Sequence, residues 1–186
     1  MSTTDVVARV RNSLKEILTC RRDVTMLAAK QKSKFEHWLK FELAAALSRD
    51  IVVPRLEDPF PQSSARSDLS LEVGGHKWYV ELKTANTNWR AQGVEEKTRP
   101  ITMNISGIIN DIHKLRDKCP PAKGIAAFVL FPVPTRIWEQ ERSKLLYHLR
   151  RIEDEGRIAR GTLSDNAEFI PLDSELGMAL FVVEVV

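Results

Sequence analysis

Two charged residues interrupt an otherwise apolar stretch, residues 78–84 (WYVELKT), and their types could do chemistry. Glu81 and Lys83 stand two positions apart, so on a β-strand both side chains project from the same face. A carboxylate binds hard cations through oxygen, and a nearby ammonium stabilises negative charge that develops on a phosphate. The pair therefore indicates either the solvent-facing side of an edge strand or part of a site that acts on phosphate esters.

A tight turn sets a second carboxylate opposite the first. The segments 68–73 and 76–84 alternate apolar and polar residues on either side of Gly-Gly, the signature of a two-residue β-hairpin. The register of such a turn places Asp68 opposite Glu81. One face is then apolar and consists of Leu69, Leu71, Val73, Trp78, Val80 and Leu82. The other face carries Asp68, Ser70, Glu72, Lys77, Tyr79, Glu81 and Lys83.

The pairing of Asp68 with Glu81 is unfavourable unless a positive charge lies between the two carboxylates. Carboxylates on directly opposed residues, with Cβ atoms ~5 Å apart, repel each other. A divalent cation relieves this repulsion, lowers the pKa of a bound water and polarises a phosphoryl oxygen. Lys83 would then support deprotonation of the attacking water or stabilise the charge that grows on the phosphate. These residues point to metal-dependent cleavage of phosphodiesters.

The helix expected over residues 33–48 carries a further acid. On a helical wheel Glu42 falls near the middle of the apolar face, whereas Glu36 lies at its edge. An acid directed at a core is costly unless it is paired or binds a metal. Glu42 is therefore either part of the site or a boundary residue bonded to a nearby arginine.

Hydrophobic periodicity predicts the elements that would position these residues. Helices are expected over 4–19, 33–48, 104–118 and 136–156, and strands over 51–57, 68–73, 76–84, 124–132 and 177–186. Between them lies a long polar loop, 86–103. The hairpin is antiparallel while later strands arrive through helices, so we expect an α/β domain with a mixed sheet. The run 124–132, apolar throughout, suits a central buried strand.

The composition of the chain indicates its general class. The chain has 186 residues, 43% hydrophobic and 28% charged, which suits one globular domain spanning 1–186. No apolar run approaches ~20 residues and no secretory signal precedes the domain, so we expect no membrane partner. Two distant cysteines give no disulfide framework or zinc motif and suit the cytoplasm. Residues 4–34 carry eight basic and three acidic side chains, which indicates either phosphate contact or a solvated helix face.

Together these residues resemble the PD-(D/E)XK nuclease superfamily, which has the restriction-endonuclease-like fold. Asp68 takes the place of the first acid, and Glu81-Leu82-Lys83 matches the (D/E)-x-K element after a similar interval. The expected order αβββαβ matches over about 33–131, with an extra N-terminal helix and a C-terminal helix plus strand as elaborations. Ser67 stands where the name-giving proline often lies, a position at which the family is lax.

The resemblance implies Mg²⁺-dependent hydrolysis of nucleic acid, usually DNA, with Mn²⁺ as a substitute. The expected metal-site residues are Asp68, Glu81, Leu82 through its carbonyl, and Glu42, which would bind or orient a metal-bound water; Glu36 is the less favoured alternative to Glu42. Asp68, Glu81, Glu42 and Lys83 are then the expected catalytic residues. Asp111 and Lys114 on the next helix either line the same cleft or form an exposed salt-bridging face. Many nucleases of this fold act as dimers, so a homodimer or a partner subunit is a further expectation.

Substrate contacts are expected from basic and aromatic side chains near the site. The loop after the catalytic strand could contact phosphates or stack a base, or it is a flexible loop anchored by its tryptophan. Arg66 could reach a phosphate or cap a strand. The candidate substrate-binding residues are Arg66, Trp89, Arg90, Lys97, Arg99 and Lys114.

Three functions follow from the sequence. The leading one is a DNA endonuclease of a defence, mobile-element or repair system. The second is a catalytically silent module of the same fold that binds nucleic acid or supports assembly. The third is an α/β protein-interaction domain whose basic N-terminal helix docks an acidic partner.

Overall fold

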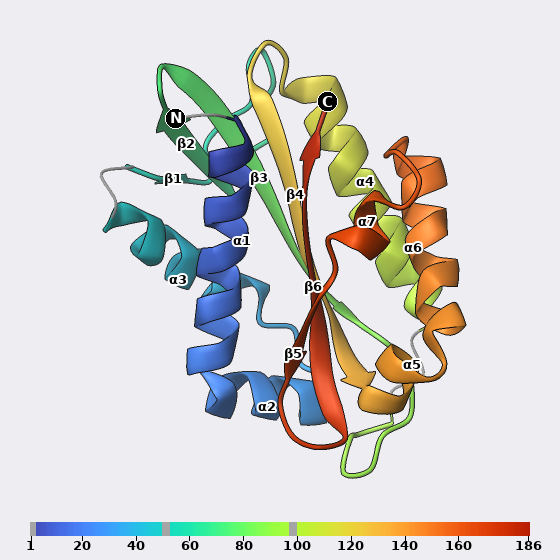
Figure 1. The fold of residues 1–186 in the computed structure, drawn as a ribbon. Helices are drawn as coiled ribbons and strands as arrows, with labels where there is room; N and C mark the ends of the chain where they lie inside the picture. The colour runs from blue at the N-terminus through green and yellow to red at the C-terminus, as the bar shows by residue number, and fades with distance from the viewer. Residues whose placement is uncertain (1–2, 50–52, 97–99) are drawn as a thin grey trace.

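The fold is a six-stranded mixed sheet with helices on both faces, seen in a computed structural model that describes residues 3–49, 53–96 and 100–186 (Figure 1). The strands lie in the order β1-β2-β3-β4-β6-β5. They are β1 (Arg55–Leu56), β2 (Leu69–Val73), β3 (His76–Asn86), β4 (Lys123–Pro134), β5 (Glu168–Pro171) and β6 (Leu176–Val185). Only β3 and β4 pair in parallel; the remaining neighbours are antiparallel. The expected α/β class and mixed sheet are therefore confirmed.

Two helical layers bury the two faces of the sheet (Figure 1). One layer contains α1 (Thr3–Cys20), α2 (Arg22–Gln31) and α3 (Glu36–Ser48). The other contains α4 (Ile101–Lys118), α5 (Thr135–Glu139), α6 (Arg142–Gly156) and α7 (Thr162–Asp165). Because side chains alternate along a strand, successive residues of β3 and β4 enter opposite cores. No helix of the described ranges is long and apolar enough to cross a bilayer.

The hairpin has the predicted register. Val73 pairs with His76, and pairing continues without a shift to Leu69 opposite Val80. Gly74 and its neighbour in the turn have φ angles of 59° and 78°, the left-handed region that this tight turn requires. The predicted apolar face packs against the α1–α3 layer.

The second face of the hairpin is not an exposed strand surface. Tyr79 and Glu81 are only 2% and 5% exposed, because α4 lies over this side of β3. β3 is also an interior strand, with β2 and β4 as its neighbours. The interpretation of residues 78–84 as the solvent-facing side of an edge strand is therefore wrong.

Several element boundaries differ from expectation. The long loop is shortened at both ends, since β3 continues to Asn86 and α4 begins at Ile101. The helix expected over 136–156 is two helices, α5 and α6, because the chain turns after α5 and runs back beside α4. The strand expected over 51–57 is limited to β1, with 51–52 outside the described residues. The helices α2 and α7 and the strand β5 were not predicted.

The expected buried central strand is confirmed as β4. From Gly124 to Pro134 each of its residues is buried. It pairs with β3 on one side and β6 on the other, and it contributes to both cores. The strand expected over 177–186 is present as β6.

Candidate functional site

The candidate site lies where β3 extends beyond the end of its partner β2. Pairing with β2 ends at Val80, and beyond it side chains replace the missing strand. The N–H of Leu82 donates to Asp68 Oδ2 at 2.9 Å, and the N–H of Thr84 donates to Glu36 Oε2 at 3.0 Å. The N–H and C=O of one strand residue project to the same side, so the Leu82 carbonyl also faces this edge. Two carboxylates and a carbonyl thus converge beside β3.

Glu81 is buried between β3 and α4, next to this edge. Its side chain is 6% exposed, and Oε1 lies 2.7 Å from Lys114 Nζ. Burial raises the pKa of Glu81 to about 8; attraction to Lys114 opposes this shift, and repulsion from Asp68 adds to it. Glu81 is therefore a carboxyl group that needs positive charge to ionise fully at neutral pH.

Lys83 is held by two acids from two helices. Its Nζ lies 3.2 Å from Asp111 Oδ2 on α4 and 3.8 Å from Glu36 Oε1 on α3. Burial lowers the pKa of Lys83, but attraction to these acids outweighs it and leaves the pKa above its ordinary value. The Lys83 side chain passes close to Gly107, where an added Cβ would lie 3.5 Å from Lys83 Cε. Lys83 is thus a fixed ammonium group at neutral pH.

Two further lysines pair with acids of this group, which still holds five acids against three lysines. Lys40 Nζ lies 3.7 Å from Asp68 Oδ1 and also contacts Glu57. Lys114 Nζ donates to the carbonyl of Arg66 at 2.6 Å in addition to its contact with Glu81. We call this group the acid–lysine cluster; it consists of Glu36, Lys40, Glu57, Asp68, Glu81, Lys83, Asp111 and Lys114.

The structure shows which of the acids on α3 and which of the candidate residues on α4 belong to the cluster. Glu42 is not in it: its Oε1 lies 3.6 Å from Arg21 Nη1 and its side chain is 35% exposed. The expectation that Glu42 faces the core is therefore wrong, and the alternative of an arginine-bonded boundary residue holds. The buried face of α3 includes Lys40, which is 5% exposed. Glu36 lies one turn earlier on the same face and therefore reaches β3, where it accepts the Thr84 N–H. Asp111 and Lys114 belong to the cluster rather than to an exposed salt-bridging face.

Lys40 was missed by the sequence analysis, although a signal for it was present. It falls at helical spacing with Leu43 and Leu47, on the apolar side of α3. Its distance of four residues from Glu36 also places these two side chains on one helix face. A buried lysine at that position requires an acidic partner, which Glu57 and Asp68 provide.

The oxygen atoms of the cluster suit a hard cation. Glu81 Oε1 and Asp111 Oδ2 are buried and receive no hydrogen bond of good geometry, although each has an ammonium nearby. Within the described ranges, no three His, Cys, Asp or Glu side chains form a ready metal-binding group. Mg²⁺, however, is commonly bound through one or two carboxylates together with waters and substrate phosphate. Asp68, which lies close enough to Glu81 to raise its pKa by repulsion, Glu81 itself and the Leu82 carbonyl would be the oxygen donors of such a site.

Among the described substrate-binding candidates, Lys114 belongs to the cluster and Arg66 lies beside it, whereas Trp89 and Arg90 lie elsewhere. Arg66 is exposed, and its Nη1 donates to the carbonyl of Glu57 at 2.8 Å, beside the cluster. Trp89 is half-buried against the α4-side core, which fits the interpretation of an anchoring tryptophan. The candidates Lys97 and Arg99 lie outside the described residues.

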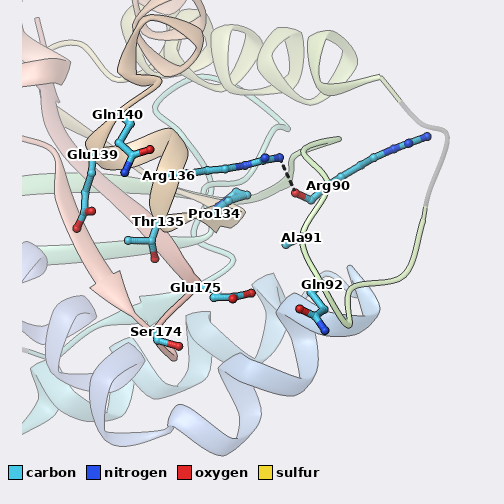
Figure 2. Close-up of a pocket in the computed structure, with 10 residues that line it drawn as sticks. All are labelled: Arg90, Ala91, Gln92, Pro134, Thr135, Arg136, Glu139, Gln140, Ser174 and Glu175. Atoms are coloured by element: carbon cyan, nitrogen blue, oxygen red, sulfur yellow. Dashed lines mark hydrogen bonds between the residues drawn. The ribbon is translucent and has the colours of Figure 1, made fainter.

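Arg90 lines a separate pocket near the end of β4. This pocket has a volume of about 470 Å³ and contains no residue of the acid–lysine cluster. Figure 2 shows Arg136 directed at the backbone carbonyl of Arg90, with Nη2 at 3.4 Å. The Arg90 side chain is 83% exposed and its Nε lies 3.4 Å from Glu96 Oε1. Arg90 thus lies at the pocket and not at the cluster.

The basic N-terminal segment is partly used for packing. Arg11 donates to the carbonyl of Val182 at 3.0 Å, and Arg22 donates to the carbonyl of Pro171 at 2.9 Å. Lys15 pairs with Glu168 at 2.6 Å. These contacts attach α1 and α2 to β5 and β6, so part of the basic charge of this segment is used in packing against the sheet.

The chain matches no family model, no curated protein and no solved structure. Its function must therefore be inferred from the acid–lysine cluster.

Proposed function

We propose that the protein is a metal-dependent nuclease that hydrolyses phosphodiester bonds, with DNA as the substrate. One observation carries the proposal: a buried carboxyl group, Glu81, is repelled by the nearby Asp68, which bonds the edge of β3 at Leu82, and Lys83 follows two residues further along the same face. Keeping acids this close in a partly buried place is costly unless the place binds positive charge. Hydrolysis of a phosphate diester requires just such a combination of cation and ammonium.

The arrangement of elements supports the restriction-endonuclease-like topology. The order α3, β1, β2, β3, α4, β4 follows the αβββαβ order of the PD-(D/E)XK superfamily. In this proposal α1 and α2 precede that core, and α5 to β6 follow it. The acid, (D/E)-x-K and helix-acid positions are then Asp68, Glu81 to Lys83, and Glu36.

The residues divide into metal-holding, orienting and charge-stabilising groups. Asp68, Glu81 and the Leu82 carbonyl would hold Mg²⁺, or Mn²⁺ in its place. The cation supplies an acidified water and a polarised phosphoryl oxygen. Glu36 orients water at the edge of β3. Lys83 stabilises the charge that develops on the phosphate; its raised pKa keeps it protonated, which disfavours a role as a general base.

The proposal is tested by incubating supercoiled plasmid with the protein and Mg²⁺ or Mn²⁺. Lys83→Ala should reduce nicking at least ~100-fold, since a positioned charge stabiliser is typically worth that much. The matched control is Lys118→Ala, which removes an exposed lysine from α4 and should leave nicking unchanged. Equal nicking by both variants, each verified as folded by circular dichroism, would end the proposal.

One observation favours the silent module as a second candidate. Asp68 and Glu36 already accept backbone hydrogen bonds from β3, and each acid of the cluster already has a lysine Nζ within 4 Å. Such a network could serve stability alone. A silent module would bind DNA with a steep dependence on salt and would show no nicking in Mg²⁺ or Mn²⁺.

A further inference from the structure

Lys114 differs from the other lysines of the acid–lysine cluster in how it is held. Lys40 is deeply buried and bonded to Glu57, while Lys83 lies between two acids. Lys114 is 28% exposed and, among the described residues, forms an ion pair with one carboxylate, that of Glu81 at 2.7 Å. Its other polar contact is a backbone carbonyl, that of Arg66 at 2.6 Å. A long flexible side chain with partial exposure can move away from its acid when another cation takes its place, whereas leaving the buried Glu81 carboxylate without any positive partner would be costly.

We propose that Lys114 supplies, in the metal-free protein, the positive charge that a divalent cation supplies when bound, and that Lys114 therefore limits the affinity of the site for metal. This inference rests on the proposed function, because it takes Glu81 as a metal-holding residue. An ammonium 2.7 Å from Glu81 Oε1 occupies the space beside that oxygen and repels an incoming cation. Metal binding must therefore separate Lys114 from Glu81.

The surroundings of Lys114 suit such an exchange. After release from Glu81, its Nζ keeps the Arg66 carbonyl as an acceptor and stays near the Phe60 ring, whose centroid is 5.3 Å away. The ammonium would then remain at the rim of the site, where a phosphate of the substrate can meet it. The same residue would thus neutralise the acid before metal binding and contact substrate afterwards.

The test measures Mn²⁺ affinity without DNA, by isothermal titration and by the rise in melting temperature with Mn²⁺. Lys114→Met keeps the length of the side chain and removes its charge. We expect the Mn²⁺ dissociation constant to fall about tenfold or more, because a neighbouring unit charge is lost. Lys118→Met, on the exposed side of the same helix, removes the same charge and should change the constant less than about twofold.

Further variants keep the outcome decisive. Lys114→Arg retains the charge and should bind Mn²⁺ as the unmodified protein does. Lys114→Gln serves if Lys114→Met does not fold, and circular dichroism checks the folding of both variants.

Tighter Mn²⁺ binding by the neutral variants only, or Mn²⁺ binding that appears only in them, supports the inference. Mn²⁺ binding and plasmid nicking with no change on neutralising Lys114 would overturn the inference and leave the nuclease proposal standing. Absence of both Mn²⁺ binding and nicking from all of the proteins would overturn both.

Discussion

Glu81 is a carboxyl group whose surroundings oppose its charge. It is 5% exposed and has acids on two sides, and the single ammonium at Lys114 does not cancel these effects. Burial of this kind at a structural position would normally be relieved by an amide or an apolar side chain. A role in binding a cation would explain why this position carries an acid although the acid lowers stability.

Glu81→Gln should raise stability at neutral and alkaline pH and flatten the dependence of stability on pH. The folded-state pKa of about 8 exceeds the ordinary 4.5, so the folded chain keeps a proton that the unfolded chain loses. The stability that the neutral Glu81 carboxyl group contributes is therefore fully present below about pH 4.5 and is lost as the pH rises through about pH 8. The loss is on the order of 3–5 kcal/mol, and it should be absent in the glutamine variant.

Urea denaturation at about pH 4 and about pH 9 measures this slope. The control is Glu72→Gln on the neighbouring strand, where the side chain is exposed. A slope that survives in Glu81→Gln would show that another group is responsible.

Glu36→Ala and Glu42→Ala should differ, although both acids lie on α3. Removal of the Glu36 carboxylate leaves the Thr84 N–H without its acceptor and takes a partner from Lys83. We expect a cost of about 1–3 kcal/mol. Glu42 makes one half-exposed contact with Arg21, so its loss should cost less than about 1 kcal/mol. Chemical denaturation distinguishes the two, and a larger cost for Glu42 would contradict the assignment.

Residues on strands were more predictable than residues on helices. A side chain on a strand can project from only one of two faces of the sheet. The register fixed by the double-glycine turn was therefore enough to predict that Asp68, Glu81 and Lys83 lie on one face of the hairpin. A helix can be rotated by any angle, and a shift of the buried face by one residue exchanged Glu42 for Lys40. The role of α4 as the cover over Glu81 depends on tertiary packing, which local patterns do not contain.

At the scale of elements, a glycine of α4 faces the Lys83 side chain of β3. Gly107 stands within the helix, and an added Cβ would make only ordinary contact, 3.5 Å, with the Lys83 side chain. Gly107→Ala should therefore be tolerated and should raise stability by up to about 1 kcal/mol, because alanine favours helix over glycine. A larger side chain, as in Gly107→Leu, should displace Lys83 and reduce any Lys83-dependent activity.

Gly177→Ala gives the contrasting result at the start of β6. There an added Cβ would lie 2.3 Å from Phe169 Cζ and 2.7 Å from the carbonyl oxygen of Ile170. We expect a loss of about 1–3 kcal/mol, the usual cost of overpacking. Thermal unfolding of the two alanine variants compares them directly; an equal effect at both positions would contradict the packing described for β6.

At the scale of the whole molecule, the segments outside 33–131 are part of one sheet and its two cores. β6 pairs with β4 along most of its length, α1 packs on β6, and α6 covers α4. A fragment restricted to 33–131 would expose one edge of β4 and leave both cores uncovered. It should lack a cooperative thermal transition, whereas the full chain should show one. A dispersed NMR spectrum from the fragment would contradict this expectation.

The open edge of β3 has a spectroscopic consequence. The amide protons of Leu82 and Thr84 are bonded to carboxylate oxygens instead of strand carbonyls, so their resonance frequencies follow the electron density on Asp68 and Glu36. Two peaks of a ¹⁵N-correlated spectrum therefore act as built-in sensors for separate sides of the cluster. They would register any ion or phosphate that draws on either acid, even where no turnover can be seen.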